Sequence, residues 1–327
     1  MLRYAIRRLL INIPVLLVLS FAGFFAAREI ADPATSLRSN PRVRPEDLER
    51  YRESLGLDDG PLEQYWRWLT AFVTGDLGKS LIRNSQDVWS LIESALANTL
   101  VLVGVAITFS LLIGITTGIV AAMRQNTFVD YASTGFSFVF ISMPTFWFAL
   151  MVQLLFAVYL QDWIPGLNGP LLPSAGLYPP GQRTFDLFER GRHVALPALV
   201  LSVQLIAVYS RYMRASMLEV LGLDYVRTAR SKGLSERRVV TRHAARNAMI
   251  PITTQAGTDL GLLIGGLIVT EQIFQYPGMG TLFLDALFAG DYPILLAWIM
   301  VTATAVVLAN LAIDLIYGYL DPRIRVV

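Results

Sequence analysis

Long stretches of this chain contain no charged side chain, and this feature constrains its fold more than any other. Of its 327 residues, 54% are hydrophobic and 16% are charged, whereas a soluble domain is about 25% charged. Seven runs lack Asp, Glu, Lys and Arg: residues 9–27, 99–123, 131–161, 194–210, 247–258, 260–270 and 292–313. Several approach or exceed the roughly 20 residues that a helix needs to cross a membrane. The runs exclude an ordinary soluble enzyme and a barrel of alternating strands, so we expect an all-α polytopic membrane protein.

Six transmembrane helices are predicted. The basic start and the apolar run at residues 9–27 resemble a signal peptide, but no Ala-x-Ala cleavage site follows, which favours a retained anchor. Pro144 should kink the third crossing, because proline removes a backbone donor, and Asp259 splits the apolar run of the fifth. The remaining five crossings are expected near residues 98–123, 132–160, 194–214, 248–270 and 293–317.

Lysines and arginines gather in segments that six crossings place on one side of the membrane. Three arginines precede the first crossing, Arg124 follows the second, and two more end the chain. Nine further basic residues lie between the fourth and fifth crossings: Arg211, Arg214, Arg227, Arg230, Lys232, Arg237, Arg238, Arg242 and Arg246. The excess of basic residues marks this side, with both termini, as the cytoplasm. Residues 28–94, 161–193 and 272–292 then face outward.

Residues 28–94 are expected to form a polar extracytoplasmic insertion, between an N-terminal part at 1–27 and a five-helix core at 95–327. The insertion carries 9 basic and 12 acidic residues. A short helix is predicted near residues 45–51, with acidic side chains in its first turn. A second is predicted at 61–74, where tryptophans favour a helix resting at the lipid headgroups; a small lobe packed on the bundle is the alternative.

The basic segment at residues 215–250 is too long for a simple turn between two crossings. Asp224 is a candidate N-cap for a short helix from Tyr225 to Lys232, and Gly233 is its expected stop. Ser235 is a candidate cap for the next helix. Two interpretations of this segment are open. Its charge alone favours a basic loop held by anionic headgroups; the alternative is a short rigid helix that transmits force to a partner.

Several familiar kinds of active site are excluded by composition or spacing. A net charge of +2 offers no basic field for nucleic acid, and the absence of cysteine excludes disulfides and thiolate metal sites. The two histidines, His193 and His243, are too few for a multi-histidine metal cage. Gly78-Lys79-Ser80 resembles the end of a phosphate-binding loop, but Val73 stands where its first glycine belongs. We therefore expect a chain that is not an enzyme and binds no cofactor itself.

Residues 225–234, Tyr-Val-Arg-Thr-Ala-Arg-Ser-Lys-Gly-Leu, resemble the EAA loop of binding-protein-dependent ABC transporter permeases, in the form of the oligopeptide/dipeptide/nickel subfamily. Arg227-Thr228-Ala229 stands where the general motif has Glu-Ala-Ala, and Gly233 follows at the proper distance. The leading Glu is absent, as is usual in this subfamily. Further matches lie at residues 1–10, 55–65, 75–78, 193–198, 270–280 and 314–325, so the resemblance covers nearly the whole chain.

The resemblance implies a pore-forming subunit of a prokaryotic inner-membrane importer. Its partners would be a second homologous permease, two cytoplasmic ATPase subunits that hold ATP and Mg, and an extracytoplasmic solute-binding protein. Small peptides are the implied substrate class, with nickel chelates, glutathione and other solutes as alternatives. The implied ATPase-coupling residues are Asp224, Tyr225, Val226, Arg227, Thr228, Ala229, Arg230, Lys232, Gly233 and Leu234. Of these, Arg227, Arg230 and Lys232 would contact the ATPase, and Gly233 would supply the break.

Two sets of glycines repeat every four residues and form smooth ridges on predicted crossings. Gly257, Gly261 and Gly265 lie on the fifth crossing, and Gly114 and Gly118 on the second. Such ridges allow another helix to approach closely. They indicate either tight packing within the bundle or a sliding contact with the partner permease.

Asp259 lies near the middle of the membrane, where a charge is costly and normally faces protein or water. With Gln255 and Thr258 it would either line the translocation pathway or be hydrogen-bonded inside the bundle. Glu271, at the end of this crossing, is expected to be a rim charge bonded to the following loop. Two rival functions stay open: a secondary transporter that uses Asp259 as a proton or cation site, and a non-transporting receptor or scaffold.

Overall fold

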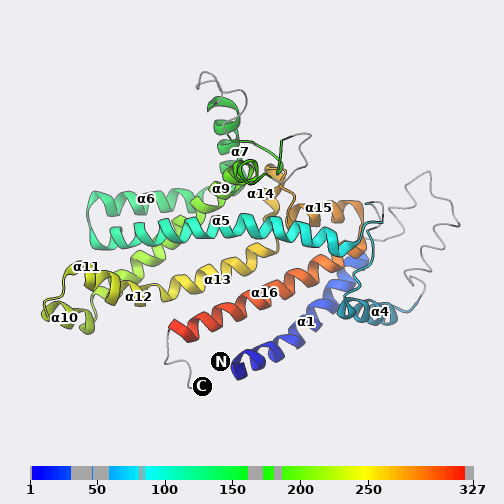
Figure 1. Cartoon of the computed structure of the whole chain (residues 1–327), viewed down its shortest axis with the longest axis horizontal. Coiled ribbons are helices and arrows are strands. Elements are labelled where there is room, and N and C mark those ends of the chain that lie inside the picture. The colour runs from blue at the N-terminus through cyan, green and yellow to red at the C-terminus, as the bar shows by residue number, and fades with distance from the viewer. Residues whose placement is uncertain are drawn as a thin grey trace.

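A computed structural model describes residues 2–30, 59–80, 85–160, 172–179 and 186–320, together with Glu46 and Arg83. The regular elements of this part of the chain are all helices, in agreement with the predicted all-α class. Figure 1 shows most of the long helices running lengthwise through the molecule, whereas α7 (Thr145–Leu154) stands across them. The helices α10 (Asp224–Ser231), α11 (Glu236–Arg238) and α12 (Ala245–Ala248) lie together at one end, and α4 (Pro61–Thr74) and α15 (Met279–Ala289) lie toward the other.

Four helices of the described part are long and apolar enough to cross a membrane without a break: α1 (Leu2–Ile30), α5 (Val88–Met123), α9 (Leu187–Leu221) and α16 (Tyr292–Leu320). They contain the first, second, fourth and sixth predicted crossings. The α5 helix starts earlier than its predicted crossing, at a cap where the Asp87 carboxylate accepts from the Ser90 amide at 3.1 Å. The start of α1 and the end of α16 lie toward the same end of the bundle as α10 (Figure 1).

The third predicted crossing is a bent pair of helices and not one kinked helix. The α6 helix (Phe128–Ser142) meets α7 (Thr145–Leu154), which continues into the π-helical turn η1 (Leu155–Tyr159), at an angle of 103°. The break falls at Pro144, the expected position. Because the ring of a proline disfavours helical backbone in the residue before it, Met143 is extended, with φ −80° and ψ 126°.

The fifth predicted crossing is also broken, so the expectation of one helix over 248–270 was wrong. The α13 helix (Ile250–Ile264) is followed by α14 (Ile268–Ile273). Between them Gly266 has φ +109°, and a Cβ atom there would lie 2.3 Å from the amide nitrogen of Gly280. Residues 272–292 are not a simple loop, since they contain α15 (Met279–Ala289). The described part therefore supplies four continuous spans, or five with the bent pair.

The helix predicted within the insertion at 61–74 is present as α4 (Pro61–Thr74). Tyr65 is buried against α1, where its hydroxyl lies 2.8 Å from that of Ser20. Trp66, one residue on, stays 60% exposed. The helix therefore packs on the bundle along one side and leaves aromatic surface free on the other. The helix predicted at residues 45–51 lies outside the described residues apart from Glu46.

Both glycine ridges face helices of this same chain. On α5, a Cβ atom at Gly118 would lie 2.5 Å from Cβ of Met213 on α9, and one at Gly114 would lie 2.9 Å from Cβ of Tyr209. On α13, the ridge faces α16: a Cβ atom at Gly257 would lie 2.1 Å from the Ile313 side chain. A Cβ atom at Gly265 would lie 2.8 Å from the Thr302 side chain, and one at Gly261 would lie at an ordinary contact distance of 3.7 Å from α16.

Replacement of Gly118 by leucine should destabilise the bundle, whereas the same replacement at Gly104 on the same helix should not. The new side chain at Gly118 would push α5 away from α9, at a cost of about 1–3 kcal/mol, while a Cβ atom at Gly104 meets nothing within 4 Å. Thermal unfolding of the two detergent-extracted variants measures this. Equal melting temperatures would contradict the packing described.

Candidate functional site

The predicted short helix follows α9 directly and is α10 (Asp224–Ser231). Leu223, not Asp224, is its N-cap: its backbone is extended, and its carbonyl accepts from the Val226 and Arg227 amides at 3.0 and 3.2 Å. Asp224 is instead the first helical residue, where the helix dipole favours a negative charge. It is 97% exposed and lies 3.5 Å from Arg227.

Gly233 ends this helix, as the sequence predicts. Its φ is +74°, in the left-handed region that favours glycine, and its amide donates to the Arg230 carbonyl at 2.9 Å. A Cβ atom there would meet nothing within 4 Å. Glycine is therefore favoured at position 233 by the backbone conformation, since there is room for a side chain. The chain then turns into α11 (Glu236–Arg238), whose N-cap is Ser235.

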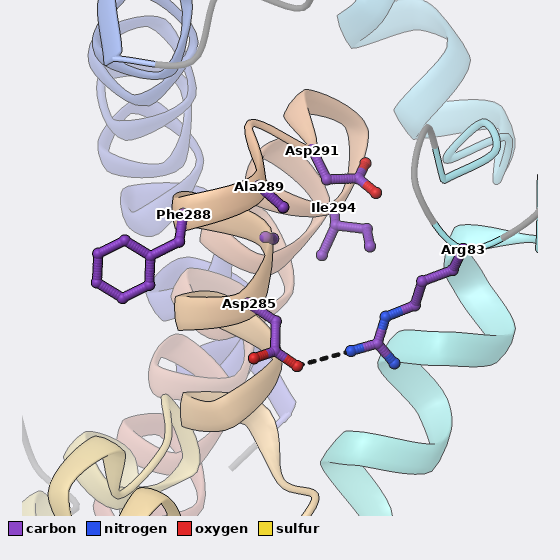
Figure 2. Close-up of a pocket in the computed structure, with 7 residues that line it drawn as sticks. Arg83, Asp285, Phe288, Ala289, Asp291 and Ile294 are labelled. Carbon is purple, nitrogen blue, oxygen red and sulfur yellow. Dashed lines mark hydrogen bonds and ion pairs between the residues drawn. The ribbon is translucent and has the colours of Figure 1, made fainter. Parts of the chain in front are cut away.

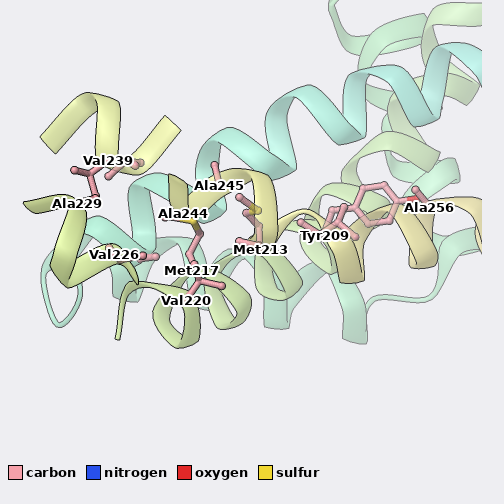
Figure 3. Close-up of a cluster of buried hydrophobic side chains, with 14 residues drawn as sticks. Tyr209, Met213, Met217, Val220, Val226, Ala229, Val239, Ala244, Ala245 and Ala256 are labelled. Atoms are coloured by element: carbon pink, nitrogen blue, oxygen red, sulfur yellow. The ribbon is translucent and has the colours of Figure 1, made fainter. Parts of the chain in front are cut away.

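The α10 helix has two chemically distinct faces. Val226 and Ala229 are buried in a hydrophobic cluster, where they lie with Val239 and Val240 of the following π-helical segment η2 (Val239–Ala244) (Figure 3). Leu234 is partly buried against the same cluster. The exposed residues of the helix are Asp224, Tyr225, Arg227, Thr228, Arg230 and Ser231, followed by the exposed Lys232 and Gly233.

Polar contacts fix α10 to the segment that leads into α13. The Tyr225 hydroxyl donates to the His243 carbonyl at 3.3 Å and accepts from the Asn247 amide group at 2.7 Å. Arg230 makes two hydrogen bonds to Glu236, at 2.7 and 3.1 Å, across the Gly233 break. The guanidinium holds the pKa of Glu236 below its usual range. Arg230 therefore braces the loop, whereas Arg227 projects outward and is 70% exposed.

The hydrophobic cluster around α10 continues into the bundle. It extends through Met217 and Met213 of α9 to Tyr209, and reaches Ala256 of α13 (Figure 3). The α10 helix and the bundle therefore share one packed core, in which a displacement of α10 meets close-packed side chains.

Asp259 and Gln255 lie at the end of this cluster that is farthest from α10, half-buried between α13 and α9. The two oxygens of the Asp259 carboxylate accept separately from the Tyr209 hydroxyl and the Gln255 amide group, each at 2.9 Å. Thr258 does not join them: it is exposed and donates to the Thr254 carbonyl at 3.1 Å.

A buried ion pair that sequence reasoning missed joins α6 to α9. Asp130, whose side chain is 3% exposed, accepts from Nε and Nη2 of Arg214, the latter at 2.8 Å, and from the Asn126 amide at 3.0 Å. Asp130 immediately precedes the uncharged run at 131–161, which is the one signal that marks it in the sequence. The pair satisfies both charges and fixes the turn between α5 and α6 to α9.

Glu271 is fully buried, so the expectation of a rim charge bonded to the following loop was wrong: it is bonded to the first turn of α15 and to α5. Its carboxylate accepts from the Gly280 and Thr281 amides, at 2.7 and 3.0 Å, and from the Thr99 hydroxyl at 2.8 Å. It therefore neutralises the positive end of α15. A Cβ atom at Gly278 would lie 2.3 Å from the carboxylate, so a side chain at this position would clash with Glu271.

A cavity of about 430 Å³ lies at the end of the bundle away from α10. It is lined by Arg83, which precedes α5, and by the corner where α15 leads into α16. Figure 2 shows Arg83 reaching toward Asp285, with 2.8 Å between Nη2 and Oδ2, while Phe288 points away. Among the described residues, no group of three His, Cys, Asp or Glu side chains is placed to hold a metal ion.

The bundle of long apolar helices is typical of a multi-pass membrane protein. A family model described as "Binding-protein-dependent transport system inner membrane component" matches residues 114–326. The model for the N-terminal part of the same kind of protein matches residues 1–103. The chain therefore belongs to the family of binding-protein-dependent transport system inner membrane components.

Relatives of known name match over nearly their full length. The oligopeptide transport system permease protein AppB of Bacillus subtilis is 38% identical, over 98% of this chain and 99% of its own. The dipeptide transport system permease protein DppB of Escherichia coli K12 is 35% identical, over 99% of each chain. A solved structure of the MetNI methionine ABC transporter, in an inward-facing conformation, superposes with a TM-score of 0.54 at 16% identity. It covers 71% of this chain and 97% of that one, and it supports the fold alone.

Replacement of Glu271 by glutamine should lower the melting temperature of the extracted protein. The amide would have to place a donor where the carboxylate now only accepts, which costs about 1–3 kcal/mol. The same replacement at Glu236 is the control: it removes an exposed ion pair, which contributes little. An equal effect of both variants on thermal unfolding would show that Glu271 is not the buried anchor described.

Proposed function

We propose that this chain is the permease subunit of an ATP-driven importer of di- or oligopeptides, coupled to cytoplasmic ATPases through α10. Membership of the family and the names of the relatives support the transport role. The observation that carries the coupling role is the division of α10 into a buried apolar face and an exposed polar face. ATP and Mg would be held by the ATPases, and the chain would form the pathway with a second homologous permease. A solute-binding protein would deliver the peptide from outside.

The exposed face of α10 is suited to docking against another protein. Arg227, Thr228 and Lys232 offer donors and positive charge, while Val226 and Ala229 hold the helix to its own subunit. The Tyr225 and Arg230 contacts add rotational restraint. An ATPase that moves α10 would therefore move α9 and α13 with it, through the shared hydrophobic cluster.

Six crossings remain our proposal for the topology. The bent α6–α7 pair would form the third, and α13 with α14 would form the fifth, since broken spans are tolerated where protein or a water-filled cavity surrounds them. The basic segment at 215–250 and both termini would then face the cytoplasm. Residues 28–94 would lie outside, between the parts at 1–27 and 95–327.

The translocation pathway is proposed to run past Gln255, Thr258 and Asp259. All three are at least partly exposed on α13, whose other polar side chains are Thr253 and Thr254. Polar side chains facing hydrocarbon are costly, and such residues normally face a bundle interior or a water-filled cavity. A pathway shared with the second permease would provide that environment.

Replacement of Gly233 by valine should uncouple transport from ATP hydrolysis. A branched side chain strains the left-handed backbone at this position and would disturb the end of α10. Uptake of a labelled dipeptide should fall at least tenfold, while the chain still inserts into the membrane. Gly75→Val is the matched control: Gly75 also has a positive φ, of +89°, and open space around it, but lies at the end of α4. Wild-type uptake by Gly233→Val would refute the coupling role.

Replacement of Asp259 by asparagine should leave uptake within about tenfold of wild type and dependent on ATP. A proton- or cation-coupled transporter would depend on this carboxylate, whereas in an ATP-driven importer it serves as an acceptor for Tyr209 and Gln255. Uptake is measured with ATP depleted and, separately, with the proton gradient collapsed. Uptake that resists ATP depletion and is abolished by Asp259→Asn would establish the secondary transporter instead.

A further inference from the structure

A second cavity, of about 600 Å³, lies on the side of the bundle between α6 and α9. Its lining includes Thr134, Phe138 and Ile141 of α6, and Arg211, Tyr212 and Arg214 of α9. Arg211 is the first charged residue after the uncharged run at 194–210. The cavity therefore lies where α9 leaves the hydrocarbon layer, at the basic end of the bundle. Neither α10 nor Asp259 and its two partners contribute to its lining.

The two arginines of this cavity differ in their electrostatic state. The charge of Arg214 is neutralised by the buried Asp130 carboxylate. The Arg211 guanidinium lies over the ring of Phe138, with its central carbon 4.7 Å from the ring centroid. Among the described residues no carboxylate lies within 4.0 Å of Arg211, so the cavity keeps one uncompensated positive charge. The aromatic ring orients the guanidinium without neutralising it.

The surface beside the cavity is apolar. On α6, Phe138, Val139 and Ile141 are each more than 40% exposed, so hydrocarbon chains can pack there. Tyr212, which is 44% exposed and carries a hydroxyl group, also lines the cavity. A cation, a hydroxyl group and an adjoining apolar surface at the membrane boundary match the phosphate and acyl chains of a lipid, since basic pockets between membrane helices bind anionic headgroups.

We propose that this cavity is a binding site for an anionic phospholipid, in which Arg211 binds the headgroup phosphate and α6 packs against the acyl chains. Arg214 remains paired with Asp130 and shapes the cavity. A zwitterionic lipid would leave the charge of Arg211 uncompensated overall, so a net negative headgroup should bind more tightly.

The test is native mass spectrometry of the complex in which the chain is extracted, titrated with phosphatidylglycerol or phosphatidylcholine. Wild type should retain phosphatidylglycerol in preference to phosphatidylcholine, and Arg211→Gln should weaken that retention about tenfold. Arg124→Gln is the matched control, because Arg124 is an exposed arginine at the same end of the bundle but outside the cavity. Equal retention of the two lipids, or retention unchanged by Arg211→Gln, would overturn the proposal.

A measurement on the unaltered protein covers the case in which Arg211→Gln does not assemble. Phosphatidylglycerol with a photoreactive headgroup should label peptides from residues 134–141 or 208–215. Labelling confined to other segments would overturn the proposal. So would competition of this labelling by a dipeptide, which would assign the cavity to the carboxylate of the substrate.

Discussion

The close approach of α5 to α9 is the contact on which the rest of the structure depends. Gly118 and Gly114 remove the side chains that would separate the two helices, which brings α5 against Met213 and Tyr209. These two residues belong to the cluster that holds α10 at one end and contacts α13 at the other. The same packing thus fixes the position of α10 and of the Tyr209–Asp259 hydrogen bond.

Three acidic side chains within the bundle each have hydrogen-bond partners in this chain. Asp130 is held by Arg214, Asp259 by Tyr209 and Gln255, and Glu271 by backbone amides at the start of α15. Each arrangement avoids the cost of an isolated charge away from water. Arg211 differs, because among the described residues its guanidinium lies over the ring of Phe138 and pairs with no carboxylate, and its charge is the basis of the proposed lipid site.

Sequence reasoning located most helices and the short helix with its glycine stop, because uncharged runs and glycine each act locally. It failed where distant contacts decide the backbone. Gly266 was placed inside one helix over 248–270, but its backbone is left-handed and lies against Gly280, and the helix breaks there. The ion pair of Asp130 with Arg214 joins residues 84 positions apart, and the burial of Glu271 depends on Thr99 of another helix. No local pattern contains these partners.

The central proposal, that a cytoplasmic ATPase binds the exposed face of α10, is tested most directly by cross-linking. The chain has no cysteine, so single-cysteine variants require no background substitutions. Thr228→Cys, on the exposed face, should form a covalent product with the ATPase when treated with a short thiol-to-amine cross-linker, and Val226→Cys, on the buried face, should not. Reaction of Thr228→Cys with a membrane-impermeant reagent added outside intact cells, with no ATPase product, would contradict the account.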